Sequence, residues 1–406
     1  MSGRPLRLLF TLPWATRSGG AEEMLQALVE GGPRHGYESE VVFLQEGPWP
    51  EQLRAEGVPV HVLGAGRVRE LHLGARAVLR LARILRRRRP DVVLNWVAKT
   101  QLYGSPAAML AGIGERVVWW QHAIPEGRGH WLDRAATALP AAAIGCTSHA
   151  AAEAQRRIRP GRPMFVVAAG TRAPEGAHTG DAGGRPAGEP AAGGPPAVEG
   201  ARADPAVPPG PPAGTLVVGL VARLQPWKGQ DRLLRAAALL RERGHDVHVL
   251  LVGGDSWSLA PDYASALPRL IGELELDGQV TMTGEVPDAG PYIDRMDVLV
   301  NASDPEPFGI VLLEGMARGV AVVAVDSGGP REIVQDGVTG MLARSGEPIA
   351  LADAIEPLLV SSELRSRLAA AGRARFEEEF TEDAMCRRFA GRMRTLVAAR
   401  EGGQGG

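Results

Sequence analysis

Two glutamates in the second half of the chain stand where they could bind hydroxyl groups. Glu306 and Glu314 are eight residues apart. The segment Phe308–Ile310 between them predicts the start of a helix, whose free N–H groups would point toward the same loop. Carboxylates that accept paired hydrogen bonds suit the vicinal hydroxyls of a sugar or a ribose. Glu314 stands in a strongly apolar stretch, where a buried carboxylate is costly without a partner, and this favours a ligand role over an ordinary helix position.

Two cations lie upstream at a spacing that suits an anion. Arg223 follows the predicted strand Leu216–Val221, and Lys228 comes five residues later at the start of the next predicted helix. A helix N-terminus supplies free N–H groups and a partial positive charge, and the two side chains add full charges, so the group suits a diphosphate. The alternative is a pair of solvated loop residues. Lysine is rare in this chain, with Lys99 as the only other one, and this favours a specific role for Lys228.

Two further residues follow predicted strands and carry open interpretations. Gly253 comes directly after Val247–Val252, where a glycine either lets a ligand approach the backbone or forms a tight turn. His122 follows the apolar run Arg116–Trp120. A lone histidine after a buried strand is commonly structural, but its position at a strand end also permits a role in chemistry.

Strand and helix patterns alternate along both halves of the chain. This order predicts an α/β protein of two Rossmann-like domains, each a parallel sheet covered on both faces, facing one another across a central cleft. Ligands of such sheets bind beyond the carboxyl ends of the strands, where the residues named above lie. Residues 71–89 show the clearest helical stripe. The predicted strands are Leu6–Leu12, Glu40–Leu44, Val58–Leu63, Asp91–Trp96, Arg116–Trp120, Leu216–Val221, Val247–Val252, Gln279–Thr283, Val298–Asn301 and Val320–Val325.

A change in composition divides the 406 residues. Residues 173–213 contain ten Pro and nine Gly with few large apolar groups, so they predict a flexible linker or insertion. The predicted domains are residues 1–172 and residues 214–380, one on each side of this segment. Residues 381–406 are predicted to form a C-terminal helix and a disordered tail.

Charge is distributed unevenly between the halves. The net charge of the whole chain is −2, which provides no polyelectrolyte signal for nucleic acid. Residues 1–172, however, carry 23 basic against 14 acidic residues, a net charge of +9. The run Arg86–Arg89 ends a predicted helix. The basic charge of the first half suggests an anionic acceptor or an anionic lipid surface. For the run itself, a solvated helix end that complements the helix dipole is the favoured interpretation, with a membrane patch as the alternative.

The sequence favours a cytoplasmic location, with a peripheral position at the inner face of the membrane as a further expectation. No stretch reaches the ~18 apolar residues of a membrane span. The apolar run Leu8–Trp14 is interpreted as a buried strand rather than a signal peptide. The two cysteines, Cys146 and Cys386, form neither a disulfide framework nor a metal knuckle and fit a reducing cytosol. The excess of arginine over lysine is typical of a GC-rich bacterial genome.

The motifs of the second half resemble those of the retaining GT-B glycosyltransferases of family 4, the glycosyl transferases group 1. The resemblance covers residues 215–345 and is carried by Glu-Pro-Phe-Gly at residues 306–309 with Glu314, by Glu-Gly-Met-Ala-Arg-Gly-Val-Ala-Val-Val-Ala at 314–324, and by Gly-Gly-Pro-Arg-Glu-Ile-Val at 328–334. The first half is similar less closely, through residues 19–22, residues 121–122 and the strand and turn at Val166–Thr171.

The resemblance implies roles for the residues of the second half. Arg223 and Lys228 would neutralise the donor diphosphate as the leaving group develops charge. Glu306 would contact the hydroxyls of the transferred sugar, and Glu314 would hold the ribose hydroxyls. The backbone amides of Phe308, Gly309 and Ile310 would contact the sugar and the phosphate, near Gly253.

For the first half, the resemblance implies that Gly20 lets the backbone approach the phosphates and that His122 lies near the sugar and the acceptor. Enzymes of this class need neither a metal ion nor a cofactor, and retention is thought to proceed by front-face substitution. Glu306 is therefore not assigned as a nucleophile, and the two-carboxylate scheme of hydrolases is not implied.

The leading expectation is an enzyme that moves a hexose from a nucleoside diphosphate sugar to a glycan or lipid-linked acceptor, in bacterial polysaccharide biosynthesis. One alternative is a sugar-nucleotide epimerase or hydrolase of the same fold, which needs no acceptor site. The other is a non-catalytic GT-B partner subunit. The presence of all four residues Arg223, Lys228, Glu306 and Glu314 argues against this last alternative, because a disused site need not keep them.

Overall fold

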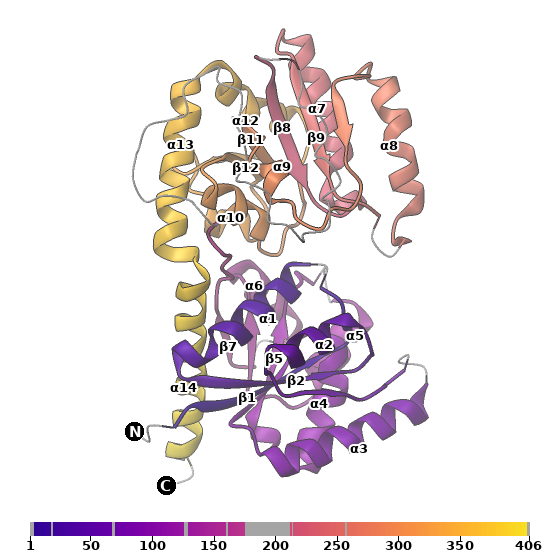
Figure 1. Cartoon of the computed structure of the whole chain (residues 1–406), viewed down its shortest axis with the longest axis vertical. Helices are drawn as coiled ribbons and strands as arrows, with labels where there is room; N and C mark the ends of the chain where they lie inside the picture. Colours follow the sequence, from indigo (N-terminus) through magenta and orange to yellow (C-terminus); the bar gives the residue numbers. More distant parts are fainter. Residues whose placement is uncertain are drawn as a thin grey trace. The chain divides into compact units, whose positions relative to one another are not determined.

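The chain folds into two compact units in the computed structural model. One unit comprises Met1–Thr171 together with Phe380–Gly406, and the other comprises Arg172–Glu379 (Figure 1). The structure describes residues 4–17, 19–66, 70–125, 129–159, 161–174, 212, 214–255 and 258–403. The predicted linker, residues 173–213, lies almost wholly outside the described residues, as does the end of the predicted tail. The first unit is called the N-unit below and the second the C-unit.

The N-unit is built on a seven-stranded parallel sheet with the order β3-β2-β1-β4-β5-β6-β7. Its central strands are runs of apolar residues because helices cover the sheet on both faces. The strands are β1 (Leu6–Leu12), β2 (Tyr37–Phe43), β3 (Val60–Val62), β4 (Val92–Asn95), β5 (Val117–Gln121), β6 (Ala143–Cys146) and β7 (Met164–Val166). The helices are α1 (Gly20–Gly31), α2 (Pro48–Ala55), α3 (Leu71–Arg88), α4 (Ala98–Leu110), α5 (Trp131–Ala138), α6 (His149–Ile158) and α14 (Glu382–Gly403).

The C-unit is built on a six-stranded parallel sheet with the order β10-β9-β8-β11-β12-β13. Valine, leucine and alanine side chains of the sheet and of α7 and α12 form its largest core. The strands are β8 (Leu216–Val221), β9 (Val247–Val252), β10 (Val280–Met282), β11 (Val298–Asn301), β12 (Ala321–Val325) and β13 (Met341–Ala343). The helices are α7 (Gln230–Glu242), α8 (Pro261–Glu273), α9 (Gly290–Ile293), α10 (Ile310–Ala317), α11 (Pro330–Ile333), α12 (Pro348–Val360) and α13 (Ser362–Arg375).

Each sheet reverses its strand order at one place, and that place determines where a ligand can bind. In the C-unit the reversal lies between the neighbours β8 and β11, and in the N-unit between β1 and β4. The loops that leave two such strands diverge to opposite sides and open a crevice at their carboxyl ends. The loop that bears Arg223 and Lys228 follows β8, and the loop that bears Glu306 follows β11.

The predicted architecture of two Rossmann-like α/β domains is confirmed, and all ten predicted strands form. Leu6–Leu12, Leu216–Val221, Val247–Val252 and Val298–Asn301 have the predicted bounds, while the others shift by one to three residues. In the strand and turn expected at Val166–Thr171, the strand lies earlier than expected, because β7 spans Met164–Val166 and ends where the predicted segment begins. Strands β6 and β13 were missed, since four residues of Ala-Ile-Gly-Cys and three of Met-Leu-Ala are too short to show a pattern.

The C-terminal helix completes the N-unit rather than standing apart from it. Figure 1 shows α14 beside the N-unit, and its Cys386 thiol donates to the Ala27 carbonyl of α1. Both ends of the described chain meet at Asp91: Arg4 forms an ion pair with its carboxylate at 2.9 Å, and Arg400 donates to its carbonyl at 2.9 Å. The last residues of the chain therefore stabilise a unit made mostly of the first residues.

Phe389 is the main apolar contact that α14 brings to the N-unit. Its ring is fully buried, with centroids 5.6 Å from Tyr37, 5.7 Å from Trp120 and 6.1 Å from Phe10. We expect Phe389→Ala to lower the free energy of unfolding of the N-unit by about 3–5 kcal/mol, because it leaves a cavity among aromatic rings. Denaturant unfolding followed by tryptophan fluorescence measures this. A change below 1 kcal/mol, equal to that of the exposed control Arg392→Ala, would contradict the role assigned to α14.

Candidate active site

The first part of the site is the loop that follows β8. The pairing of β8 with β9 continues past the strand ends, because Ala222 N donates to Val252 O at 3.0 Å and Leu224 N to Gly254 O at 2.9 Å. Arg223 is therefore held at the edge of the sheet. Gly253 has a φ of 128°, and a Cβ there would lie 2.2 Å from Ala222 O. The glycine is thus required for close packing of the chain's own backbone against Ala222, which agrees with a tight turn, and its contact with a ligand stays a prediction.

Lys228 is delivered by a short 3₁₀ turn, Pro226–Lys228, that leads into α7. Gly229 ends this turn with a φ of 76°, and a Cβ there would lie 2.5 Å from the carbonyl of Ala302, just after β11. A glycine is thus needed for the two loops to come together. As a result the Lys228 ammonium forms an ion pair with Glu306 at 2.8 Å, and it also lies 3.9 Å from the centroid of the Trp227 ring.

Glu306 is the most buried charged group of this site, with 6% of its surface exposed. Burial acts to raise its pKa, but the Lys228 charge and hydrogen bonds from Lys228, Ser303 and Asn301 outweigh burial and hold the pKa below its ordinary value. Glu306 is therefore ionised at neutral pH. A buried carboxylate with a cation in contact is stable only as a pair, so each partner fixes the position of the other.

The backbone of Glu306 joins the loop after β11 to the loop after β12. Its carbonyl accepts from Gly329 N at 2.8 Å, and Glu306 forms a parallel bridge with Gly328. A Cβ at Gly329 would lie 2.4 Å from the Cα atom of Phe308, so the glycine pair packs directly on the Pro-Phe-Gly turn. The loop with Gly328 and Gly329, after β12, thus supports the turn that carries Glu306.

Helix α10 begins directly behind this turn. Gly309 is its N-terminal cap with a φ of 102°, Phe308 is buried, and Ile310 is the first helical residue. Glu314 is half-buried on α10 and lies a little more than one turn after Ile310, where the helix begins. The sequence expectation of a buried Glu314 was wrong, because Gly315 is the residue that packs against Leu299 of the sheet and Glu314 lies beside it.

Two of the predicted site residues lie in the N-unit. Gly20 is the first residue of α1, after an extended Gly19. His122 follows β5, and its ring lies 4.8 Å from that of Trp96 and 6.4 Å from that of Trp120, as centroid distances. The residue is half-buried, but within the described part of the chain its buried Nε2 atom has no hydrogen-bond partner. Burial lowers the pKa of His122 to about 3, so the imidazole is neutral at physiological pH.

Asn301 was assigned no role in the sequence analysis, although it lies just before the Glu-Pro-Phe-Gly motif. Asn301 is buried at the end of β11, where its amide nitrogen lies 3.4 Å from Glu306 Oε2 and its oxygen accepts from Ser303 N at 3.1 Å. It thereby orients the carboxylate. A polar residue at the end of an otherwise apolar strand is the signal that could have identified it.

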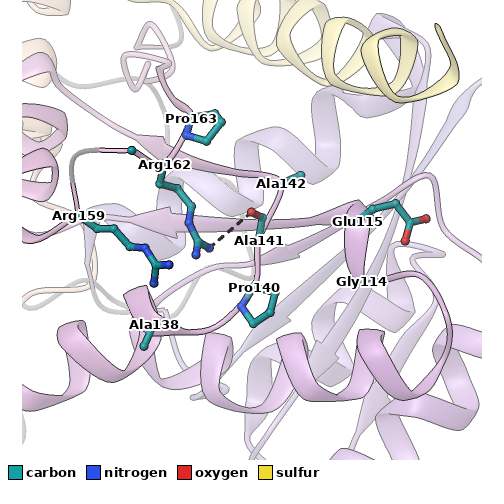
Figure 2. Close-up of a pocket in the computed structure, with 10 residues that line it drawn as sticks. Gly114, Glu115, Ala138, Pro140, Ala141, Ala142, Arg159, Arg162 and Pro163 are labelled. Carbon is teal, nitrogen blue, oxygen red and sulfur yellow. Dashed lines mark hydrogen bonds between the residues drawn. The ribbon is translucent and has the colours of Figure 1, made fainter. Parts of the chain in front are cut away.

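One surface cavity lies elsewhere, at the amino ends of β5, β6 and β7 (Figure 2). It has a volume of about 610 Å³ and contains none of the predicted site residues. Arg162 donates to the carbonyls of Leu139 at 2.7 Å and Ala141 at 3.5 Å, and Arg159 donates to Thr137 at 3.3 Å. Both guanidinium groups bind carbonyls at the end of α5, where cations complement the helix dipole, so their position is explained by structure.

The described residues contain no group of three or more His, Cys, Asp or Glu side chains arranged to hold a metal ion. What the C-unit does gather at the carboxyl ends of β8 and β11 is one ion pair and a set of glycine turns. Lys228 contacts Glu306, Gly309 lies beside Glu306, and Arg223 and Gly253 share the adjacent strand end. A cation and a helix N-terminus at such a reversal of strand order suit a phosphorylated ligand.

Comparison with known proteins agrees with this geometry. Residues 207–375 match the family model of the glycosyl transferases group 1, and residues 19–170 match that of the glycosyl transferase 4-like domain. The chain is 40% identical over 165 residues to a D-inositol 3-phosphate glycosyltransferase of Nocardia farcinica, covering 39% of this chain and 35% of the relative. It is 32% identical over 174 residues to the lipopolysaccharide core biosynthesis glycosyltransferase LpsE of Rhizobium meliloti, covering 43% of this chain and 48% of the relative.

The matched regions are about a third to a half of the length of these curated relatives. Solved structures show the same fold over nearly the whole chain. Anabaena HepE in complex with UDP-glucose has a TM-score of 0.75 at 23% identity and covers 96% of this chain and 100% of its own. WaaG, a glycosyltransferase involved in lipopolysaccharide biosynthesis, has a TM-score of 0.66 at 14% identity and covers 95% of this chain and 99% of its own. The chain thus contains a domain of the glycosyl transferases group 1 and a glycosyl transferase 4-like domain, and its fold is that of the GT-B glycosyltransferases.

Proposed function

We propose that this protein is a retaining glycosyltransferase that moves a hexose from a nucleoside diphosphate sugar to a glycan or lipid-linked acceptor in polysaccharide biosynthesis. The observation that carries the proposal is the Lys228–Glu306 ion pair, 2.8 Å long, at the point where the C-unit sheet reverses its strand order. The pair supplies a cation for a phosphate and an acid for sugar hydroxyls within one contact distance. The names of HepE, crystallised with UDP-glucose, and of LpsE support the choice of donor and pathway.

In this proposal each group of the C-unit acts on charge or orientation. Lys228 and Arg223 stabilise the negative charge that develops on the diphosphate as the bond to the sugar breaks. Glu306 accepts hydrogen bonds from the sugar, Glu314 from the ribose, and the amides of the Phe308–Ile310 turn donate to the sugar and phosphate. The departing phosphate takes the acceptor proton, so no protein nucleophile is needed. In the N-unit, Gly20 gives the phosphates access to the backbone and His122 contributes to the acceptor site.

The test of the function is a panel of UDP-, GDP- and ADP-hexoses, first by thermal shift and then by product analysis with and without a glycan acceptor. We expect one nucleotide to raise the melting temperature, and transfer to occur with retention of the anomeric configuration only when acceptor is present. A new sugar nucleotide formed without acceptor would identify an epimerase, and free hexose formed alone would identify a hydrolase. Binding without any turnover would support the non-catalytic partner subunit.

Turnover is expected to be independent of metal ions and of any cofactor. Arg223, Lys228 and the N-terminus of α10 supply the positive charge that a divalent cation supplies in other enzymes. Excess chelator should therefore leave the initial rate unchanged within error, measured by release of nucleoside diphosphate in metal-free buffer. Loss of activity with chelator and its recovery on addition of Mg²⁺ would contradict this part of the proposal.

We also propose that the N-unit contacts an anionic membrane at the inner face through the basic end of α3, Arg86–Arg89. Helix α3 carries further arginines before that run. Arg76, Arg80, Arg83 and Arg87 are exposed and follow one another at intervals of three or four residues, which places them on one face, called the arginine face below. Like charges at this spacing destabilise a helix on their own, so a negatively charged partner suits them.

Exposed apolar side chains accompany the arginine face. Leu79 lies on the same face of α3 with 49% exposure, and Met109 and Leu110 at the end of α4 are 55% and 51% exposed. Arg86 donates to the Leu110 carbonyl at 2.5 Å, which joins the end of α4 to α3. A basic helix with exposed apolar side chains binds in the headgroup region of an anionic bilayer. No helix in the described part of the chain is long and apolar enough to span a membrane.

Replacing the four arginines of the arginine face by Gln should abolish binding to anionic vesicles. Each arginine near such a surface contributes about 1 kcal/mol, so the four together lower the partition coefficient by about 10³-fold. Co-sedimentation with phosphatidylglycerol-containing vesicles measures this, with pure phosphatidylcholine as the neutral surface. The matched control replaces four exposed arginines elsewhere, Arg235, Arg269, Arg367 and Arg392, by Gln. Equal loss in both variants would show that net charge alone matters and would refute the arginine face.

A further inference from the structure

Gln230 closes the loop that carries the two cations of the proposed donor site. It is the first residue of α7 and is completely buried. Its side-chain nitrogen donates to the backbone carbonyl of Arg223 at 2.8 Å. One hydrogen bond thus joins the two ends of the segment 223–230, with Arg223 at one end and Lys228 near the other. Backbone contacts hold the middle of this segment, because Asp304 N donates to the carbonyl of Trp227 at 3.0 Å.

A tyrosine from the neighbouring helix α8 fixes the start of α7. The Tyr263 hydroxyl donates to Asp231 Oδ1 at 2.7 Å and accepts from Asp231 N at 3.1 Å, and it also lies 3.2 Å from Gln230 Oε1. Burial and the hydrogen bond to Asp231 raise the pKa of Tyr263, so the hydroxyl keeps its proton at neutral pH. Gln230 is therefore held from both sides, by Arg223 through its amide nitrogen and by Tyr263 next to its amide oxygen.

The hydrogen bond from Gln230 to the Arg223 carbonyl bears on how the two cations would meet a charged ligand. Hydrogen bonds from Ala222 N and Leu224 N to the end of β9 hold the backbone on either side of Arg223. Glu306 contacts the Lys228 ammonium at 2.8 Å. The hydrogen bond from Gln230 adds a direct link between the Arg223 carbonyl and the start of α7, and so bears on the separation between the Arg223 backbone and Lys228. A diphosphate that both cations contact needs this separation to be constant, because cations that must first be reoriented stabilise developing charge less.

We propose that Gln230 is a positioning residue of the donor site, which holds the Arg223 backbone at a fixed distance from Lys228 through the hydrogen bond between its amide and the Arg223 carbonyl. Gln230 itself touches neither donor nor acceptor. Its effect on turnover rests on the proposed function, whereas its effect on the order of the segment 223–230 does not.

The kinetic test uses Gln230→Met, which keeps length and volume but cannot donate. We expect kcat for transfer to fall by about 10–100-fold, because a displacement of about 1 Å at a catalytic group can cost that much. The KM of the donor should change much less, since Lys228 and Glu306 remain in place. Tyr263→Phe, which keeps the ring, should give a smaller loss of kcat and serves as the second variant if Gln230→Met folds poorly. Arg235→Gln, on the exposed face of α7, is the matched control and should keep the kcat of the wild type.

A second measurement needs no turnover. Trp227 lies inside the segment, its indole N–H donates to Gln225 at 2.7 Å, and Lys228 lies over its ring. In protein labelled with 5-fluorotryptophan, the fluorine signal of Trp227, assigned with Trp227→Phe, should be single in the wild type and in Arg235→Gln. In Gln230→Met it should broaden or split.

The two measurements separate the outcomes. A wild-type protein that transfers no sugar would overturn the proposed function, and the fluorine spectrum would still decide whether Gln230 orders the segment. An unchanged Trp227 signal in Gln230→Met would overturn the positioning role. So would a broadened signal with kcat equal to that of the wild type, or a fall in kcat no larger than the loss of folded protein.

Discussion

Lys228→Ala should reduce kcat/KM for the donor by about 10²–10³-fold, since removal of one group that stabilises transition-state charge has an effect of that size. The loss should appear mainly in kcat, because the diphosphate gains an additional negative charge as the bond to the sugar breaks. Initial rates with saturating acceptor measure it, and Arg235→Ala on the exposed face of α7 controls for the loss of one positive charge. Activity within threefold of the wild type would refute the assigned role.

The same substitution leaves Glu306 buried without its cation, and this must be separated from catalysis. Breaking a buried pair on one side costs about 3–5 kcal/mol of stability. We therefore expect Lys228→Ala to unfold at lower denaturant concentration, and the double variant Lys228→Ala/Glu306→Gln to regain most of that stability. The double variant should remain inactive. Recovered activity in it would show that the single variant failed through instability rather than through loss of the cation.

Glu306→Gln should lower kcat by about 10²-fold or more while the protein stays folded. The amide keeps the shape of the carboxylate but cannot accept from two sugar hydroxyls with the strength of a charged group, and it no longer fixes the Lys228 ammonium. Donor turnover with saturating acceptor measures the effect, with Glu242→Gln at an exposed position of α7 as the control. A variant with unchanged kcat would show that the carboxylate contacts nothing in the transition state.

The dependence of stability on acidic pH tests the same ion pair between Lys228 and Glu306. The pKa of Glu306 in the folded protein lies below its ordinary value. Such a group stabilises the fold above its pKa in the unfolded chain, and this contribution disappears as the pH falls through the lowered pKa of the folded protein. The free-energy difference between wild type and Glu306→Gln should thus be constant near neutral pH and shrink in acid. A difference that does not vary with pH would contradict an ionised Glu306.

Much of the fold could be predicted because most residues of its central strands are apolar. β8, β9 and β11 consist mostly of valine and leucine, and such short apolar runs are typical of buried parallel strands. β6 and β13 could not be predicted, since three or four residues carry no periodicity. The position of α14 could not be predicted either, because its contacts with Phe10 and Tyr37 join residues more than 300 positions apart.

The candidate site could likewise be predicted only in part. The residue types at 223, 228, 306 and 314, and their places just after strands, could be taken from the order of residues alone. Whether Lys228 touches Glu306 could not, because this depends on β8 and β11 being neighbours and on Gly229 fitting under the Ala302 carbonyl. The half-buried state of Glu314 and the roles of Asn301 and Gln230 likewise depend on packing.

The order of residues is enough to predict the class of fold, two alternating α/β halves, and the charged groups of the candidate site, because hydrophobic pattern and residue chemistry are local properties. Packing of the folded chain sets which of these groups meet, that the cation and the acid form one ion pair, and that the last helix belongs with the first strands. Those are contacts between distant residues, and they exist only once the sheets have set the order of their strands.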